Sequence, residues 1–463
     1  MVEMTQTQNI QAPSRSRRIG FVSTRLAGTD GVSLETVKWV TVLERLGHNC
    51  FYFAGQSDWP AERSRIVPEA FFGHDAIDEI THISFSNNWR DHVARTRGHP
   101  EIYAIYTQAI SREIRPRIVT QRIHELCEYL KQQLYSFVRD FHLELLIIEN
   151  ALAIPMNIPL GLALTEFIAE TGIQTIAHHH DFYWERDRFL VNCVSDYLNM
   201  AFPPTLPSIR HIVINSIAAR ELSRRTGNSA LVVPNVMDFD QPPAPPDAYA
   251  QDVRLALGLA PDEKFLLQPT RVVQRKGIED AIELARRIGL KARLVISHAS
   301  GDEGDDYERR VREYADLINA PVNFEADLIR AERGQTPDGH KIYRLADVYQ
   351  HADLITYPSR IEGFGNAFLE AIYYRRPIIV NSYSTYAVDI KPRGFRVIEF
   401  DGYITDATMQ QTRHVLEHPQ LAAEMAEHNY HLAQQYFSYT VLASRLQMLI
   451  TDCFGEETGV WTK

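Results

Sequence analysis

A glycine turn between two carboxylates is the stretch of this sequence best suited to chemistry. Glu362 stands directly before Gly363-Phe364-Gly365, and a helix-forming run from Asn366 to Tyr374 contains Glu370, eight positions after Glu362. The N–H groups of a helix start lack intrahelical partners and favour phosphates. Eight helical residues rise about 12 Å, so one carboxylate can accept hydrogen bonds from sugar hydroxyls and the other from a ribose. The layout suits a nucleotide sugar, although a structural turn is the plain alternative.

Two cations follow another strand-like run. Arg271 and Lys276 bracket a turn after the apolar residues 265–269. Fixed cations at this place would neutralise a leaving diphosphate. A solvated basic loop explains the same residues, and the sequence alone leaves both interpretations open.

Three histidines, His178, His179 and His180, stand in a row at the end of a predicted strand, directly before Asp181. Successive side chains of a strand point to opposite faces, so the run is not a ready three-ligand metal site. We expect no metal there. One or two of the rings can reach the carboxyl end of the sheet.

A short glycine loop, Gly28-Thr29-Asp30-Gly31, opens a predicted helix near the N-terminus. Its backbone N–H groups can face an anion. A plain tight turn is equally consistent with these residues. Neither this loop nor the turn at Gly363 carries the Gly-Lys-Ser/Thr ending of a Walker loop.

The composition narrows the class of protein. The 463 residues carry a formal net charge of −11, which argues against a nucleic-acid binder, and no apolar run is long enough to span a bilayer. The four cysteines lack metal-like or CxxC spacing and indicate reduced, structural thiols, as expected in a cytoplasm; they are Cys50, Cys127, Cys193 and Cys453.

Strand-like and helix-like runs alternate along the first half of the chain, which predicts an α/β fold with parallel sheets. Residues 1–17 are polar, and we expect a disordered tail there; residues 60–118 are less regular and predict an inserted helical or loop excursion. The expected strands are 18–25, 49–54, 143–149, 173–180, 211–215 and 231–234, and the expected helices are 32–46, 159–171 and 217–225.

A proline-rich segment at 239–261 predicts a stiff linker between domains. Beyond it, strand-like and helix-like runs alternate again. The expected strands are 265–269, 292–297, 322–326, 354–358 and 377–381, and the expected helices are 277–288, 305–318, 342–351 and 366–374. A mostly helical tail follows from residue 408. We therefore expect two Rossmann-like domains, 18–238 and 262–437, with a last helix at about 438–463 that packs back on the first. Such domains bind ligands in the crevice at the carboxyl ends of their strands.

Together these residues resemble the family-4 retaining glycosyltransferases of the GT-B fold, from about Arg18 to the C-terminal helices. The strongest match is the run 357–366, completed by Glu370 as a Glu-x7-Glu pair. Residues 348–353, Pro234-Asn235 with Asp238, and Arg271 with Lys276 also look like that family. Residues 180–186 and 381–389 resemble a bacterial subgroup that includes relatives of mannosylglucosylglycerate synthase and, more distantly, of sucrose-phosphate synthase.

The resemblance implies a GT-B fold whose two domains face each other across a cleft. It implies transfer of a hexosyl group from a nucleotide diphosphate sugar to a hydroxyl of a small sugar, sugar acid or glycan, with retained configuration. It also implies a metal-independent enzyme without a cofactor. The composition described above adds the expectation of a cytoplasmic location, without a nucleic-acid partner or an expected membrane contact.

Roles for single residues come from the same resemblance. Glu362 would contact the donor sugar, and Glu370 the ribose. His180, chosen because Asp181 follows it, would contact the donor sugar or lie near the reacting carbon. The diphosphate would be held by the two cations Arg271 and Lys276 and by backbone N–H groups of Gly363, Phe364, Gly365, Asn366 and, across the cleft, Gly31.

One departure from the family pattern stands after the next strand. Many relatives carry a glycine pair where this chain has the polar and aromatic run 381–386, which predicts a bulkier, more polar wall of the sugar site. Two other functions stay open on this evidence: a nucleotide-sugar epimerase of similar two-domain build, and a non-catalytic nucleotide-sugar sensor.

Overall fold

The computed structural model describes residues 15–28, 30–85, 115–300 and 304–455. The chain forms two compact units: unit 1 comprises Met1–Pro234 and Leu442–Lys463, and unit 2 comprises Asn235–Val441. Most of the expected N-terminal tail and residues 86–114 of the expected excursion lie outside the described residues.

Unit 1 is built on a seven-stranded parallel sheet with the strand order β5-β3-β1-β6-β7-β8-β9. Its strands are β1 (Arg18–Val22), β3 (Asn49–Ala54), β5 (Ser64–Ile66), β6 (Leu145–Glu149), β7 (Gln174–His179), β8 (Ile209–Val213) and β9 (Ala230–Val232). Strand order reverses between β1 and β6, which makes their carboxyl ends the topological switch point where such sheets bind ligands.

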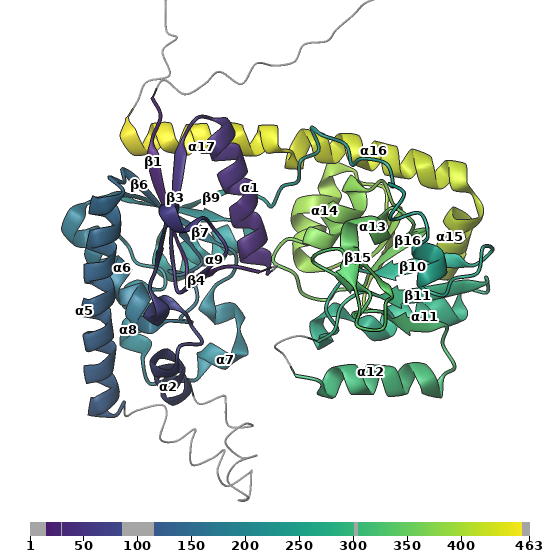
Figure 1. The fold of residues 1–463 in the computed structure, drawn as a ribbon, viewed down its shortest axis with the longest axis horizontal. Coiled ribbons are helices and arrows are strands. Elements are labelled where there is room, and N and C mark those ends of the chain that lie inside the picture. Colours follow the sequence, from purple (N-terminus) through teal and green to yellow (C-terminus); the bar gives the residue numbers. More distant parts are fainter. Residues whose placement is uncertain (1–14, 29, 86–114, 301–303, 456–463) are drawn as a thin grey trace, which may run out of the picture. The chain divides into compact units, whose positions relative to one another are not determined.

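The helices of unit 1 are α1 (Gly31–Arg45), α2 (Asp75–Ser84), α5 (Arg117–Asp140), α6 (Ile158–Thr171), α7 (Asp187–Leu190), α8 (Ser195–Ala201), α9 (Ser216–Thr226) and most of α17 (Tyr439–Phe454). The three helices expected at 32–46, 159–171 and 217–225 are present as α1, α6 and α9, whereas α2, α5, α7 and α8 were not individually expected. Figure 1 shows α5 and α6 on one side of the sheet and α1 on the other. A short pair of strands, β2 (Arg25–Leu26) and β4 (Gln56–Ser57), lies outside the main sheet.

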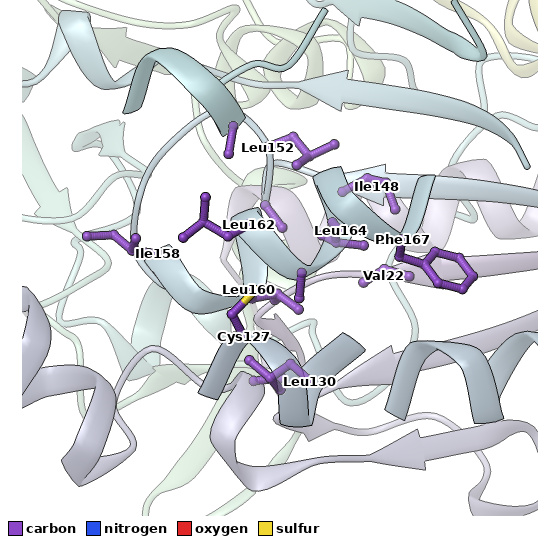
Figure 2. Packing of buried hydrophobic residues seen from close by; sticks show 14 of the residues in the cluster. Val22, Cys127, Leu130, Ile148, Leu152, Ile158, Leu160, Leu162, Leu164 and Phe167 are labelled. Carbon is purple, nitrogen blue, oxygen red and sulfur yellow. The ribbon is translucent and has the colours of Figure 1, made fainter. Parts of the chain in front are cut away.

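The core of unit 1 fixes the strand ends in place. Leu160 and Phe167 of α6 are fully buried together with Val22 of β1 and Leu130 of α5 (Figure 2). Burying a Val, Leu or Phe side chain contributes about 1.5–3 kcal/mol. Helix α6 is apolar nearly all round because it is covered on its sheet side and by α5.

Unit 2 repeats the plan with a six-stranded parallel sheet in the order β12-β11-β10-β16-β17-β18. Its strands are β10 (Lys264–Gln268), β11 (Ala292–Ile296), β12 (Val322–Phe324), β16 (Leu354–Tyr357), β17 (Ile378–Asn381) and β18 (Ile398–Phe400). The order reverses between β10 and β16. The loops after these two strands are therefore the ligand-binding edge expected for this sheet.

The remaining elements of unit 2 cover this sheet or extend from it. The helices are α10 (Val253–Ala256), α11 (Ile278–Arg287), α12 (Asp306–Leu317), α13 (Leu345–Tyr349), α14 (Asn366–Tyr373), α15 (Asp406–Glu417) and α16 (Pro419–Phe437). A small sheet contains β13 (Ile329–Arg330), β14 (Gly334–Gln335) and β15 (Lys341–Arg344). Among the described helices, none is long and apolar enough to cross a bilayer.

The unit boundary differs from the expected linker at 239–261. It falls between Pro234 and Asn235, and the proline-rich segment belongs to unit 2. Phe239 is fully buried there, and its carbonyl accepts a hydrogen bond from the hydroxyl of Tyr430 at 2.9 Å. Prolines stiffen a chain whether or not it is packed, so the composition did not reveal that this segment has an apolar anchor. The last helix, expected at about 438–463, is α17, and its residues from Leu442 group with unit 1.

Candidate functional site

The loops after β10 and β16 bring an acid and a base together at the switch point of unit 2. Lys276 Nζ forms an ion pair with Glu362 Oε1, and the two side chains are only 12% and 10% exposed. Arg275 lies 3.9 Å from the other oxygen of Glu362. Burial raises the pKa of Glu362, but the charge and hydrogen bond of Lys276, together with Ser359 and Arg275, outweigh it, and the net pKa lies below its usual value. Glu362 is therefore a charged, largely buried carboxylate.

A glycine allows these two loops to approach. Gly277 has φ +60°, and a Cβ atom there would lie 2.5 Å from the carbonyl oxygen of Pro358. The backbone N–H of Arg360 donates to the carbonyl of Arg275 at 2.8 Å. The loop that carries Lys276 is thus joined by its backbone to the loop that carries Glu362.

The second glycine of the Gly363-Phe364-Gly365 turn is also required by geometry. Gly365 has φ +125°, and an added Cβ would lie 2.5 Å from the hydroxyl of Tyr383. L-residues rarely adopt this backbone conformation. Helix α14 begins directly afterwards at Asn366, as the sequence predicted.

The polar run 381–386 supports this turn by hydrogen bonds to its carbonyl oxygens. The Tyr383 hydroxyl donates to Phe364 at 2.7 Å, Thr385 Oγ1 lies 3.2 Å from the carbonyls of Glu362 and Gly363, and Asn381 Nδ2 donates to Ser359 at 3.2 Å. Asn381, Tyr383 and Thr385 are buried. The expectation that this run forms a bulkier sugar wall is corrected for these three side chains: they are buried supports of the turn, because its carbonyl groups need donors.

Helix α14 carries the other two polar residues of the predicted site. Asn366 Oδ1 accepts a hydrogen bond from Asn235 Nδ2 at 2.7 Å, and Glu370 Oε2 accepts one from the hydroxyl of Tyr349 at 2.8 Å. Tyr349 is buried and stacks on Tyr374 with ring centroids 5.0 Å apart. Burial, followed by the charge of Glu370, raises the pKa of Tyr349 well above its usual value. Tyr349 therefore stays a neutral donor that fixes the Glu370 carboxylate.

Arg271 is half-buried after β10, and its positive charge adds to that of Lys276. Both charges act on His298, which follows β11: burial first, then Arg271 and Lys276, lowers the pKa of His298. His298 Nδ1 lies 2.7 Å from Ser297 Oγ. The sequence analysis missed His298, although a histidine just past the end of a predicted strand was a readable signal. Lys276, Arg271 and Glu362 therefore meet at one edge of the unit 2 sheet.

In unit 1, Gly31 begins α1, but the cap of this helix is an acid. Asp30 Oδ1 accepts hydrogen bonds from the N–H groups of Val32 and Ser33, both at 3.1 Å, and Arg25 pairs with the same carboxylate. An anion at this helix start would have to compete with Asp30. The predicted anion site at Gly31 therefore has two of its N–H groups already engaged.

The three histidines divide between the faces of β7 as a strand requires. His179 Nε2 lies 2.9 Å from His211 Nδ1 on one face. His178 Nδ1 and His180 Nε2 both lie 3.0 Å from the same oxygen, Oε2 of Glu149. His178 and His179 are 1% exposed, whereas the His180 side chain is 10% exposed. Of the three rings, His180 is the one with surface left for a ligand.

Glu149 was missed by the sequence analysis. It ends β6, is fully buried, and pairs in register with His178 of the neighbouring strand. The register of two parallel strands was needed to place it beside the histidines. A carboxylate as the last residue of an otherwise apolar strand was the only signal available.

The ligand atoms of Glu149, His178 and His180 lie within 4.8 Å of one another, which raises the question of a metal. A metal-bound histidine normally donates its second ring N–H to a partner. His178 Nε2 is buried and has no hydrogen-bond partner among the described residues, so a metal on Nδ1 would leave a buried donor unsatisfied. A hydrogen-bonded triad in which both rings donate to Glu149 fits these atoms better.

Comparisons with known proteins agree with the fold. The chain is 31% identical over 407 residues to mannosylglucosylglycerate synthase of Petrotoga mobilis, covering 82% of this chain and 86% of that protein. It is 28% identical over 456 residues to the synthase of the same name from Thermotoga maritima, covering 91% and 96%. The structure of sucrose-phosphate synthase from Thermosynechococcus elongatus matches with a TM-score of 0.63 and 15% identity, over 95% of this chain and 99% of that one. No protein-family model matches the chain.

Proposed function

Because this chain belongs to the GT-B glycosyltransferase family that includes the mannosylglucosylglycerate synthases, we propose that it transfers a hexosyl group with retained configuration to a small sugar-acid acceptor. The donor is a nucleotide diphosphate sugar. The names of both relatives describe a mannosyl group joined to glucosylglycerate, so a mannosyl donor and a glucosylglycerate-like acceptor are the first pair to test.

The observation that carries the donor site is the ion pair of Lys276 with Glu362 beside the glycine turn. Lys276 and Arg271 supply positive charge for the diphosphate, and the start of α14 adds its N–H groups. Glu362 and Glu370 are acceptors for hydroxyls of the sugar and the ribose. One edge of the unit 2 sheet thus offers both kinds of group that a nucleotide diphosphate sugar requires.

The proposed chemistry is departure of the diphosphate from a glycosyl carbon that develops oxocarbenium character. Fixed cations stabilise the charge that grows on the leaving group, and removing one such contact typically costs tenfold or more in rate. The acceptor hydroxyl attacks on the face that the diphosphate leaves, and a diphosphate oxygen takes its proton. Lys276 and Arg271 do the charge neutralisation that a metal performs elsewhere, so we propose a metal-independent enzyme without a cofactor.

A cytoplasmic location is part of the proposal. Its support is the state of the thiols: all four cysteines are free, and three are buried. Free thiols are typical of a reducing compartment.

The test of the function begins with the donor. Thermal stabilisation by UDP-, GDP- and ADP-linked glucose and mannose identifies the ligand, since a ligand at 100 times its Kd stabilises the native state by about 2.7 kcal/mol. Product is then sought with glucosylglycerate and related sugar acids as acceptors. Stabilisation by no nucleotide sugar, or turnover of the donor to an epimer without acceptor, would contradict the proposal.

Substitution of the cation completes the test. Lys276→Met should lower kcat at least tenfold at saturating donor, because the leaving group loses a fixed charge. Lys291→Met is the matched control, since Lys291 is an exposed lysine of unit 2 whose described partner is Asp262. Equal kcat in wild type and Lys276→Met would remove Lys276 from the mechanism.

A further inference from the structure

Glu149 is a buried carboxylate at the switch point of the unit 1 sheet, and nothing in the reaction described above uses it. Its Oε2 is 3.0 Å from His178 Nδ1 and 3.0 Å from His180 Nε2. Its backbone carbonyl accepts a hydrogen bond from Ser23 Oγ, beyond the end of β1, at 3.0 Å. An isolated buried carboxylate is costly. The two hydrogen bonds that Oε2 accepts from the histidine rings stabilise the charged form of Glu149.

The rings around Glu149 are themselves fixed. The ring of Trp39 stacks on His178 with centroids 4.2 Å apart. Asn150 has φ +60°, and its Oδ1 accepts the backbone N–H of His180 at 3.0 Å while its Nδ2 donates to Asp181 at 2.9 Å. His180 is thus held at its backbone by Asn150 and at its ring by Glu149.

The hydrogen bonds decide where the ring protons lie. A carboxylate only accepts, so His178 carries its proton on Nδ1 and His180 carries one on Nε2. Within the described part of the chain, Nδ1 of His180 has no hydrogen-bond partner, and the side chain is 10% exposed to solvent. The nitrogen left for a ligand is therefore Nδ1.

Several charges face His180. Glu149 contacts it from β6, His178 lies two positions before it on β7, Asp181 follows it and pairs with Arg186. Helix α1 contributes Glu35, which is 2.5 Å from Lys38. Burial lowers the pKa of His180, yet the hydrogen bond and charge of Glu149, with smaller effects of Glu35 and Asp181, outweigh it, and the net pKa is raised. Glu149 thus favours the protonated ring.

We propose that Glu149 is a positioning residue for the transfer reaction: its carboxylate fixes the ring orientation of His180 and the proton on Nε2, so that Nδ1 binds a substrate oxygen. The inference rests on the proposed function only for what His180 binds. The same geometry makes Glu149 act through His180, with no substrate contact of its own.

The test is a double-variant cycle on kcat/KM. Glu149→Gln and His180→Ala should each lower kcat/KM at least tenfold, and the double variant should be no slower than His180→Ala alone, because both changes remove one function. Glu149→Asp, which keeps the charge, should recover part of the loss. The limb of the pH profile that reports His180 should move to lower pH in Glu149→Gln, since the carboxylate that raises this pKa is gone.

Two controls distinguish failure of the positioning role of Glu149 from failure of the proposed transfer function. His211→Asn changes a buried histidine on the opposite face of the sheet and should leave kcat/KM within twofold. The ¹⁵N shifts of His180 in the substrate-free protein should report a proton on Nε2 in wild type and a changed tautomer balance in Glu149→Gln. This readout tests the geometry even if no transfer is found, whereas absence of transfer by wild type counts against the proposed function.

Three results would overturn the inference. Glu149→Gln could have wild-type kcat/KM and pH profile. The losses in the double variant could multiply, which would mean that Glu149 acts independently of His180. One equivalent of a transition metal could copurify with wild type and be lost in Glu149→Gln, which would assign the triad to coordination.

Discussion

Substituting Gly365 by Ala tests the packing of the glycine turn against its support. The residue sits at φ +125°, and the new methyl group would lie 2.5 Å from the Tyr383 hydroxyl, where ordinary contact begins at 3.4 Å. Backbone strain of this kind costs about 1–3 kcal/mol, and forced overlap in a packed region costs about 1–3 kcal/mol more. Gly365→Ala should therefore destabilise the turn and α14 by about 2–6 kcal/mol.

A second change separates the two parts of this cost. Tyr383→Phe removes the overlapping hydroxyl but also the donor to the buried Phe364 carbonyl, at a cost of about 1–3 kcal/mol on its own. In the double variant the nearest remaining atom to the new methyl is the Tyr357 hydroxyl at 3.2 Å. The double variant should then cost about 1–3 kcal/mol less than the sum of the single variants.

The assay must measure the local stability of the turn and of α14 in unit 2. All five tryptophans of the chain stand in the sequence ranges of unit 1, so fluorescence does not report on this turn. Amide hydrogen exchange of a peptide that contains α14 measures the local opening free energy directly. Strictly additive losses, or wild-type exchange in Gly365→Ala, would refute the assigned contact.

Two further outcomes follow from buried groups. Burial lowers the pKa of His211 to about 4 and that of His179 well below 6.5. Between pH 6.5 and pH 4 the unfolded chain therefore binds more protons than the folded one, and the free energy of unfolding falls as the pH falls. The loss is up to about 3 kcal/mol for His211 alone. Urea unfolding followed by tryptophan fluorescence at pH 7 and pH 4.5 should show this loss, and a loss of the same size in His211→Asn would contradict its assignment to the pair. Native protein treated with a thiol reagent should react first at the half-buried Cys193. Burial raises the pKa of all four thiols, but it also shields Cys50, Cys127 and Cys453 from the reagent. Rapid labelling of a buried thiol, read by peptide mass spectrometry, would show that the core opens.

The sheets could be predicted from the sequence because parallel strands covered on both faces are continuous apolar runs. Strand β6 was expected at 143–149 and lies at Leu145–Glu149, and α14 was expected at 366–374 and lies at Asn366–Tyr373. The same reasoning placed Lys276 and Glu362 after β10 and β16, where the structure brings them into contact, because the carboxyl ends of parallel strands meet at one edge of a sheet.

What the sequence did not reveal depends on contacts across the sheet. Glu149 becomes visible only when β6 and β7 are in register, and Tyr383 becomes a support only when β17 lies beside β16. The proline-rich segment reads as a linker until Phe239 is seen to be buried. In each case the role of a side chain depends on contact with a residue that is distant in sequence.

The backbone hydrogen bond between Arg360 and Arg275, together with the close approach at Gly277, joins the loops after β10 and β16 of unit 2, so we expect them to move together. A shift of either loop is passed to the other without passing through flexible side chains. Directed evolution of donor preference should therefore yield paired changes in 271–277 and 359–365, and single changes in one loop should first appear as losses of both sugar and diphosphate affinity.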